Sequence, residues 1–450
     1  MEETGISGVE VVKTPATNGG GGDAAVASLG PGRADETPCI SVVRRCRRAF
    51  YHGLVRAVVA VFRAALWVGR YIHLRPRDRR RADDLEILLT GTFYSDNWVN
   101  AHIRPLAASR RCGRLYVVST HPIQPTPKVV AVYPPGWLVA IVGRVPARLL
   151  VFCWMAVRRR PDIIGGFHLL VNGMVAAVVA RFVGARSMYF CVGGPAEVVD
   201  GGIRAENRLF GRMETPDHHV ERGLLRIVSE FDIIITMGAR AASFLQGRGT
   251  TVPVYVVPGG IDAGQFSLQA EPVTADLILV GRLVEVKRID VFLEAVSLVA
   301  RRMPDVTVVV VGDGVLRDEL TDRARRLRVD GRVRFVGQQS DVGQWLRRSR
   351  LFVLTSDSEG LALSLMEAMT CGLPAVVSNV GDLADLVQDG VNGYLVERRS
   401  PEAFADRIIE LLADSEKRVA FSRAALRAAK GLRVSAITVR WDAILAGSAE

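Results

Sequence analysis

Residues 351–374 carry the sequence LFVLTSDSEGLALSLMEAMTCGLP. The four apolar residues 351–354 predict a buried strand, and a short polar turn follows them. The segment from Leu361 to Thr370 is predicted to be a helix, which Gly372 and Pro374 end. The stretch is therefore a strand–loop–helix unit, which is the building block of a parallel α/β sheet.

The loop and helix of this unit carry groups that suit an anion and hydroxyl groups. Glu359 lies on the loop at the carboxyl end of the strand, and Glu367 lies two turns along the helix. The backbone N–H groups of Gly360, Leu361 and Ala362 lie at a helix start, where amides lack helical partners and the dipole favours an anion. The two carboxylates can therefore hold two polyhydroxylated groups with a phosphate between them. The alternative is an ordinary sheet unit in which two glutamates stand eight apart by chance.

Two further motifs follow, namely a strand at 375–377 with the loop Ser-Asn-Val-Gly-Asp at 378–382, and Asp-Gly-Val-Asn-Gly-Tyr-Leu-Val at 389–396. From residue 353 to about 396 the chain resembles family 4 of the retaining nucleotide-sugar glycosyltransferases. That family has two Glu separated by seven residues, then a Gly-Leu-Pro turn and a Gly-rich loop. The resemblance extends more loosely over residues 86–445. It implies two Rossmann-like, doubly wound parallel-sheet α/β domains that face a central cleft, the GT-B architecture.

The order of apolar runs favours the same organisation, because strand-like runs alternate with helical patterns along most of the chain. The strands predicted in the N-terminal half are residues 86–90, 115–119, 161–165, 187–192, 232–236 and 254–257, and the predicted helices include residues 170–184 and 398–417. Turn residues cluster at 258–262, where a domain boundary is expected. Ligands of open parallel sheets bind beyond the carboxyl ends of the strands, so the site is expected between the domains. The predicted parts are a disordered tail at 1–38, a basic amphipathic segment at 39–82, an acceptor-side domain at 83–260, a nucleotide-sugar-binding domain at 261–432, and a C-terminal helix at 433–450 that packs back toward the N-terminal domain.

Sugar transfer from a nucleoside diphosphate leaves a diphosphate, whose charge must be neutralised by a metal or by fixed positive groups. The sequence offers no Asp-x-Asp pair and no His/Asp cluster of metal-binding type, so neither a metal nor another cofactor is expected. Arg282 and Lys287 instead follow a predicted strand end, in a position to face Gly360. An Arg can bind two phosphate oxygens and a Lys supplies a compact charge. The alternative is that both are solvated loop cations.

The resemblance also implies roles for single residues. It places Arg282 and Lys287 on the donor diphosphate, in a Gly-Arg-Leu…Lys motif that begins at Gly281. It implies that Glu367 binds the ribose hydroxyls and that Glu359 contacts the donor sugar, as one of two catalytic candidates.

His168 is the other catalytic candidate, since a His at this point in the family reaches the transferred sugar; the alternative is a structural loop histidine. By the same resemblance, Gly337 lies beside the nucleotide base. Gly91 and Asn97, on the first loop of the N-terminal half, are weaker acceptor-side candidates.

The positive charge of the chain is local. Residues 44–81 contain twelve Arg and a single Asp, which accounts for the whole formal net charge of +11. Between Leu54 and Leu74 the segment is apolar, but Arg56, Arg63 and Arg70 lie seven residues apart on one helical face. Such arginines are costly inside a bilayer, so an amphipathic helix at an anionic membrane surface is predicted rather than a span. The alternative is a helix that packs on the enzyme with its arginines in water.

A second apolar and basic segment runs from Trp137 to Arg160 and is predicted to be a helix with a membrane-binding face. Nucleic acid is not expected as a partner, because aromatic interleaving and a known binding motif are both missing. Six scattered cysteines are typical of reduced thiols in the cytosol, and no secretory signal is evident. The predicted location is therefore cytoplasmic, at the inner face of the membrane.

These observations and the resemblance predict a retaining, metal-independent hexosyltransferase. It would move a sugar from a nucleoside diphosphate sugar to a hydroxyl acceptor, namely a lipid or lipid-linked glycan of cell-envelope polysaccharide synthesis. Two alternatives stay open. One is a sugar-nucleotide epimerase or a phosphorylase of the same architecture, and the other is a non-catalytic, membrane-associated scaffold.

Overall fold

The computed structural model describes residues 38–447 apart from 73, 75–83, 94, 206 and 270. The tail predicted to be disordered therefore lies outside the described residues except for its last position, and so do five of the arginines of the basic segment. The described residues from Arg48 onward form one compact unit, and those before Arg48 belong to a separate one.

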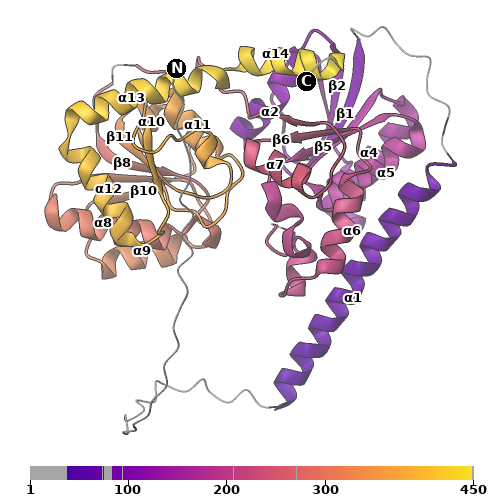
Figure 1. The fold of residues 1–450 in the computed structure, drawn as a ribbon, viewed down its shortest axis with the longest axis horizontal. Coiled ribbons are helices and arrows are strands. Elements are labelled where there is room, and N and C mark those ends of the chain that lie inside the picture. The colour runs from indigo at the N-terminus through magenta and orange to yellow at the C-terminus, as the bar shows by residue number, and fades with distance from the viewer. Residues whose placement is uncertain are drawn as a thin grey trace, which may run out of the picture. The chain divides into compact units, whose positions relative to one another are not determined.

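The N-terminal half of the larger unit is built on a seven-stranded parallel sheet with the strand order β3-β2-β1-β4-β5-β6-β7 (Figure 1). In the register of its centre, Leu89 pairs with Gly165. Six strands coincide with runs predicted from the sequence, whereas β3 was not predicted because it is only four residues long and half-exposed. The strands are β1 Leu85–Thr90, β2 Cys112–Val118, β3 Val129–Val132, β4 Ile163–Phe167, β5 Arg186–Cys191, β6 Ile233–Thr236 and β7 Val254–Val256.

Helices and short turns connect these strands. The last helix of the chain packs on α2, and its Trp441 is buried beside Phe190 with 5.9 Å between ring centroids. The helices of this half are α2 Asp96–Ala108, α3 Gly136–Val142, α4 Arg144–Arg159, α5 Met174–Val183, α6 His218–Val228 and α7 Ala239–Gly247, with the last helix α14 at Val434–Ala446. Shorter turns are η1 Leu169–Gly173, η2 Gly194–Glu197, η3 Val199–Gly201 and η4 Phe210–Met213.

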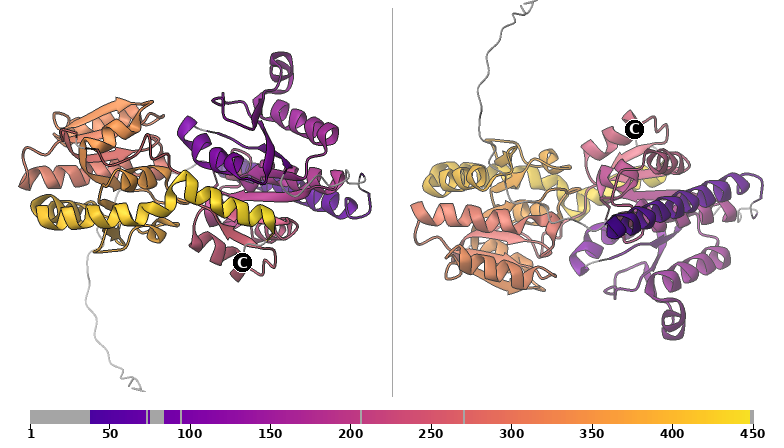
Figure 2. Two further views of the ribbon diagram at one scale, coloured as in Figure 1. Left: turned by 90° about the horizontal axis from the view of Figure 1, so that it is seen from above. Right: turned by 90° about the horizontal axis from the view of Figure 1, so that it is seen from below.

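The C-terminal half contains a six-stranded parallel sheet with the order β10-β9-β8-β11-β12-β13. Helices α8, α9 and α12 contribute to the apolar core on one face, and α10, α11 and α13 to the core on the other (Figure 2). Burial on both faces explains the uninterrupted apolar strands. The strands are β8 Ala275–Val280, β9 Val308–Val311, β10 Val333–Gly337, β11 Ser349–Leu354, β12 Ala375–Ser378 and β13 Gly393–Val396. The helices are α8 Ile289–Arg302, α9 Arg317–Arg326, α10 Val342–Arg347, α11 Leu363–Thr370, α12 Pro401–Ala413 and α13 Ser415–Ala429, with turns η5 Glu285–Lys287, η6 Leu383–Asp385 and η7 Lys430–Leu432.

Both sheets reverse their strand order at one point, between β1 and β4 in the first and between β8 and β11 in the second. Ligands of doubly wound sheets bind at such switch points, beyond the carboxyl ends of the strands. The stretch around Glu359 follows β11 and the segment around Lys287 follows β8, so both flank the second switch point.

Three predicted helices differ in detail from the observed ones. The segment from Trp137 to Val157 forms two helices, because Gly143 has φ +85 and ends α3 before α4 begins. The predicted helix at 170–184 begins with the irregular turn η1, in which Val171 has φ 72, and continues as α5. The predicted helix at 398–417 ends at Ala413, because Asp414 caps the next helix α13.

Helix α1, Pro38–Val68, contains the only stretch among the described residues that is long and apolar enough to cross a membrane, Arg45–Val68. Length and composition are the whole basis of that finding. From Arg48 onward the helix is packed on the N-terminal half, where Val55, Val59 and Leu66 are buried in one cluster with α5 and α6. Arg56 donates a 2.8 Å hydrogen bond to Asp217, so at least one predicted surface arginine is paired with the body.

Candidate active site

A cavity of about 1180 Å³ lies at the carboxyl ends of both sheets and is lined from both halves of the chain. Ten of the twelve residues singled out from the sequence line it, and their roles stay predictions. They are Asn97 and His168 from the N-terminal half, with Gly281, Arg282, Lys287, Glu359, Gly360, Leu361, Ala362 and Glu367 from the C-terminal half.

Gly91 and Gly337 are outside the described lining, although both adjoin it. The carbonyl of Gly91 accepts a hydrogen bond from Arg148, and an added Cβ would lie 2.7 Å from Phe167. Gly337 has φ +72 and ends β10, and the next residue, Gln338, lines the cavity. Both glycines are placed to shape the backbone rather than to present a side chain.

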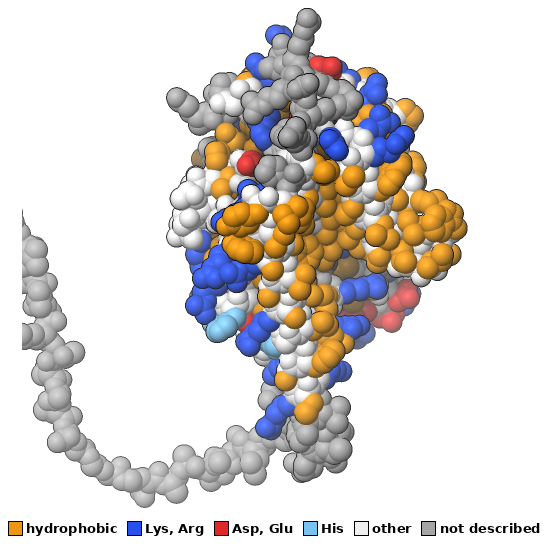
Figure 3. All heavy atoms as spheres, turned by 90° about the vertical axis from the view of Figure 1, so that its right-hand side faces the viewer, with side chains coloured by type: hydrophobic (Ala, Val, Ile, Leu, Met, Phe, Trp, Pro, Cys, Tyr) orange, Lys and Arg blue, Asp and Glu red, His pale blue; other side chains and the backbone are white. Residues whose placement is uncertain are grey.

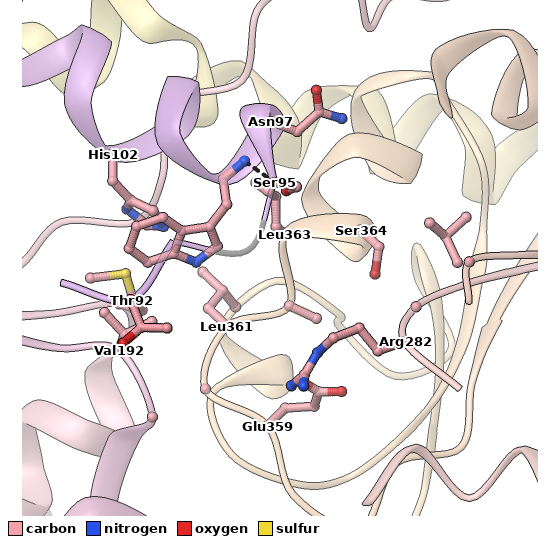
Figure 4. A pocket seen from close by; sticks show the side chains of 18 of the residues that line it. Thr92, Ser95, Asn97, His102, Val192, Arg282, Glu359, Leu361, Leu363 and Ser364 are labelled. Atoms are coloured by element: carbon pink, nitrogen blue, oxygen red, sulfur yellow. Dashed lines mark hydrogen bonds between the residues drawn. The ribbon is translucent and has the colours of Figure 1, made fainter. Parts of the chain in front are cut away.

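Lys287 and Glu359 form an ion pair at the second switch point. Lys287 Nζ donates to Glu359 Oε1 over 2.5 Å, and Ser356 Oγ donates to the same oxygen over 2.6 Å. The two charged side chains are only 15% and 10% exposed, so water screens them weakly. Arg282 follows β8, and its side chain points into the cavity on the side of Glu359 (Figure 4). Two cations and a carboxylate therefore share one wall.

The tip of α11 requires glycine because another backbone lies against it. A Cβ on Gly360 would lie 2.3 Å from the carbonyl oxygen of Val192, which follows β5 of the other half. A Cβ on Gly381 would lie 1.9 Å from the carbonyl oxygen of Glu359. The helix begins at Leu363, two residues later than predicted, and its N-cap Ala362 has no capping side chain. The amides of Leu365 and Met366 donate to the carbonyl of the N-cap residue Ala362 over 3.1 and 3.2 Å. The amides that a helix start offers to an anion are therefore those that precede Leu365.

Glu367 is the buried acid of the site. It lies on α11 with 3% of its surface exposed, and burial raises the pKa of its carboxyl to about 8. Asn97 Nδ2 on α2 donates to its Oε1 over 3.2 Å, which works against that rise. The carboxyl is therefore mostly protonated at neutral pH in this state, and it can both donate and accept hydrogen bonds.

His168 follows β4 with φ 63, a conformation that a non-glycine residue adopts only where its surroundings enforce it. Its Nδ1 lies 3.1 Å from Oε1 of Glu197. Glu197 is 1% exposed and also accepts hydrogen bonds from Leu169 N over 2.5 Å, Tyr189 OH over 2.8 Å and Gly193 N over 2.6 Å. Burial favours the neutral acid, but His168 and the backbone donors outweigh it and lower the pKa of Glu197. An ionised Glu197 accepts from Nδ1–H, so Nε2 is the acceptor nitrogen of a neutral His168 ring.

Among the lining residues that the sequence did not single out are two titratable ones that bear on His168, namely Glu197 and His102. His102 lies on α2 against Trp98, with 4.5 Å between ring centroids. Burial and the charge of His168 lower its pKa to about 3, so it stays neutral. In the sequence, Glu197 is an acidic residue four positions after Gly193, in a segment that forms the short turn η2. That position alone does not reveal its buried contact with His168.

The described residues contain no group of three or more His, Cys, Asp or Glu side chains that could hold a metal ion. The groups gathered in the cavity can instead neutralise an anion through Arg282, Lys287 and helix-tip amides. They can bind hydroxyls through Glu359 and Glu367, and they place a histidine from the opposite half within the same space.

Fold and cavity together define a two-domain α/β protein with a cavity between its halves, and the charged groups of that cavity suit an anionic ligand. Residues 265–428 match the profile of the family described as Glycosyl transferases group 1. The D-inositol 3-phosphate glycosyltransferase of Frankia alni (strain DSM 45986 / CECT 9034 / ACN14a) is 30% identical over 299 residues, which cover 60% of this chain and 70% of that protein. The chain therefore belongs to the group 1 glycosyltransferase family.

Other matches are shorter or more distant. A lipopolysaccharide core biosynthesis glycosyltransferase of Rhizobium meliloti (strain 1021) is 35% identical over 148 residues, 33% of this chain and 42% of that protein. Other curated relatives are matched over 36% to 51% of their own length. The structure of Anabaena HepE in complex with UDP-glucose superposes with a TM-score of 0.63 at 18% identity, covering 81% of this chain and all of that one. That likeness concerns the fold, and it confirms the predicted GT-B architecture.

Proposed function

We propose that the chain is a retaining hexosyltransferase that uses a nucleoside diphosphate sugar. The observation that carries the proposal is the convergence of Arg282, Lys287 and the α11 tip on one cavity with His168 of the opposite half. A diphosphate needs this set of positive groups as its negative charge develops during departure. The family membership and the sequence resemblance to family 4 support the same reaction.

In this reaction the acceptor hydroxyl forms a bond to the anomeric carbon as the bond to the diphosphate oxygen breaks. The acceptor attacks from the face that the diphosphate leaves, and a diphosphate oxygen takes the acceptor proton. Arg282, Lys287 and the α11 amides stabilise the leaving diphosphate without a metal. Lys287 is already paired with Glu359, so a bound donor would share the ammonium between carboxylate and phosphate.

The remaining cavity residues are assigned to the rest of the donor. Glu367 forms hydrogen bonds with the ribose hydroxyls of the donor. These replace the hydrogen bond that it now accepts from Asn97. Glu359 and His168 contact the transferred sugar from opposite halves, and Gly337 shapes the backbone beside the base. HepE was solved with UDP-glucose, which makes a uridine donor the first one to test.

The acceptor in this proposal is a lipid or lipid-linked glycan of cell-envelope polysaccharide synthesis, approached from the side of Asn97 and Gly91. One relative is named for lipopolysaccharide core biosynthesis, which is a form of cell-envelope glycan synthesis. The enzyme would then work in the cytoplasm at the inner face of the membrane.

A donor panel tests the function. The full chain is incubated with UDP-, GDP- and ADP-sugars, with and without EDTA, and release of nucleoside diphosphate is measured with a lipid-linked acceptor pool. We expect release from one donor class, unaffected by EDTA, and a product with the anomeric configuration of the donor by NMR. Epimerised sugar nucleotide or phosphate-dependent release of sugar phosphate would indicate the alternative enzymes. Absence of any turnover, with nucleotide binding retained, would indicate a scaffold.

A further inference from the structure

Helix α3 has no buried residue although it is almost entirely apolar, and only Leu138 and Val139 are half-buried. Its sequence is Gly-Trp-Leu-Val-Ala-Ile-Val, and none of its residues is buried. Trp137 is 66% exposed and Ile141 is 73% exposed. The surrounding segment, residues 129–143, contains no charged residue. An apolar helix that contributes nothing to the core has no stabilising role in water, because exposed apolar surface costs free energy in proportion to its area.

Helix α4 continues this surface. Val145, Leu150, Trp154 and Val157 are exposed on it, with Trp154 at 59%. Its opposite side is buried against the sheet through Phe152 and other core residues, so the helix is firmly attached. The outward residues are therefore held in place by a rigid element.

Helix α1 carries a third exposed apolar face. Phe50, Leu54 and Val61 are exposed at intervals that keep one helical face, while Val55, Val59 and Leu66 on the other side are buried. Trp67, six residues after Val61, is also exposed but lies to the side of that face. Seen from the side that α1 occupies in Figure 1, hydrophobic side chains cover much of the molecule and Lys and Arg side chains surround them (Figure 3). Patches of this kind mark interaction surfaces.

Charge identifies the partner. Residues 97–161 contain ten Lys or Arg and no Asp or Glu, and three consecutive Arg, residues 158–160, end α4. A second copy of the chain would bring like charges together, whereas an anionic lipid surface complements them. The exposed aromatic residues, Trp67, Trp137 and Trp154, are of the type that lies at the level of lipid headgroups.

We propose that the outer faces of α3, α4 and the Arg48–Val68 part of α1 form one docking surface for an anionic lipid bilayer, with α3 as the inserted element. Insertion of Trp137 and Ile141 would bury the apolar helix among acyl chains, while arginines at the ends of α4 would contact lipid phosphates. This surface is separate from the donor cavity, so the proposal does not depend on the proposed reaction.

Vesicle flotation of the full chain tests the surface. The probes are vesicles of phosphatidylcholine alone and of phosphatidylcholine with phosphatidylglycerol. We expect binding to the anionic vesicles that weakens with added salt, and a blue shift of tryptophan fluorescence on binding. The combined variant Trp137→Ser/Ile141→Ser/Trp154→Ser should lose at least about tenfold in affinity, since each buried apolar side chain contributes to partition.

The matched control is Val315→Ser/Val439→Ser, which removes two exposed apolar side chains of the C-terminal half and α14. It should bind vesicles as the wild type does, and thermal unfolding of both variants should match the wild type. Equal vesicle binding by the triple variant would overturn the proposal. So would a wild type that ignores anionic vesicles but forms a dimer that the triple variant cannot form, because the face would then be a self-association surface.

Discussion

Asn97 Nδ2 donates a hydrogen bond to Glu367 Oε1 over 3.2 Å, and this contact joins α2 of the N-terminal half to α11 of the C-terminal half. The acceptor is a buried carboxyl whose pKa is raised to about 8, so it is held mainly in its neutral form. A neutral carboxyl can exchange its amide partner for sugar hydroxyls without separating buried charges. If Glu367 binds the donor as proposed, this contact links donor binding to the arrangement of the two halves through a single side chain.

The pH dependence of stability should reveal this carboxyl. Between the ordinary pKa of glutamate and about 8, the unfolded chain has released the Glu367 proton while the folded chain retains it. The free energy of unfolding therefore falls as the pH rises through this window. Above the window Glu367 is ionised in both states, so it causes no further change. Glu367→Gln cannot ionise, so it should lose this decline and exceed the wild type in stability above the window by up to a few kcal/mol, at about 1.4 kcal/mol per pKa unit. Urea unfolding at pH values below, within and above the window measures the difference, and parallel pH profiles would contradict it.

Lys287 should contribute strongly to donor binding. Lys287→Ala removes a partly buried ammonium and leaves the Glu359 carboxylate without its ion-pair partner. Since charge-assisted hydrogen bonds are worth about 1.5–3 kcal/mol, we expect affinity for the nucleoside diphosphate to fall by at least about tenfold. Lys128→Ala is the control, because Lys128 binds the Ser109 carbonyl and does not line the cavity. Titration calorimetry compares the two variants, and unchanged affinity in Lys287→Ala would exclude Lys287 from the donor site.

The sequence predicted that several residues of the C-terminal half would lie together, because they follow strand ends; their roles stay predictions. Arg282 and Lys287 come after β8 and Glu359 after β11, and these strands are neighbours at a switch point. Parallel strands place their carboxyl ends at one edge, so the order along the chain is sufficient to bring the three together. The strand pattern of the sequence and the observed strand order therefore place these three residues at the same edge of the sheet.

The sequence could not predict contacts between distant polar residues. Glu197 supports His168 from 29 positions away through a short turn, which has no periodic pattern. Arg56 was expected at an aqueous or membrane surface, and its side chain is 53% exposed, but its pairing with Asp217, which is 161 residues away, was not predicted. The segment of helix α3 was expected to be part of one longer helix. The apolar periodicity of the sequence does not show that the chain turns at Gly143. In each case a tertiary contact or a single backbone conformation decides the outcome.

Glu197 should act as a positioning residue for His168. Glu197→Gln replaces an oxygen that accepts hydrogen bonds with a donor, so one contact to His168 Nδ1 or to a backbone amide is lost. We expect kcat to fall by about tenfold or more, with little change in the donor KM, and His168→Ala to show the same pattern. Tyr189→Phe is the control, because it removes another hydrogen bond to the same carboxylate without touching His168. If both variants lower kcat equally, the carboxylate has only a structural role.

Gly360 should be required because the two halves meet there. In Gly360→Ala the new Cβ would lie 2.3 Å from the Val192 carbonyl oxygen, a separation that forces the backbones apart. We expect a loss of about 1–3 kcal/mol in stability, as for other overpacked contacts, together with weaker donor binding because the α11 tip moves. Gly331→Ala is the matched control, since a Cβ at that position meets no atom within 4 Å. Urea unfolding and donor titration of both variants measure the two effects. A Gly360→Ala variant that equals Gly331→Ala in both measurements would show that the α11 tip and the end of β5 are not in contact in solution.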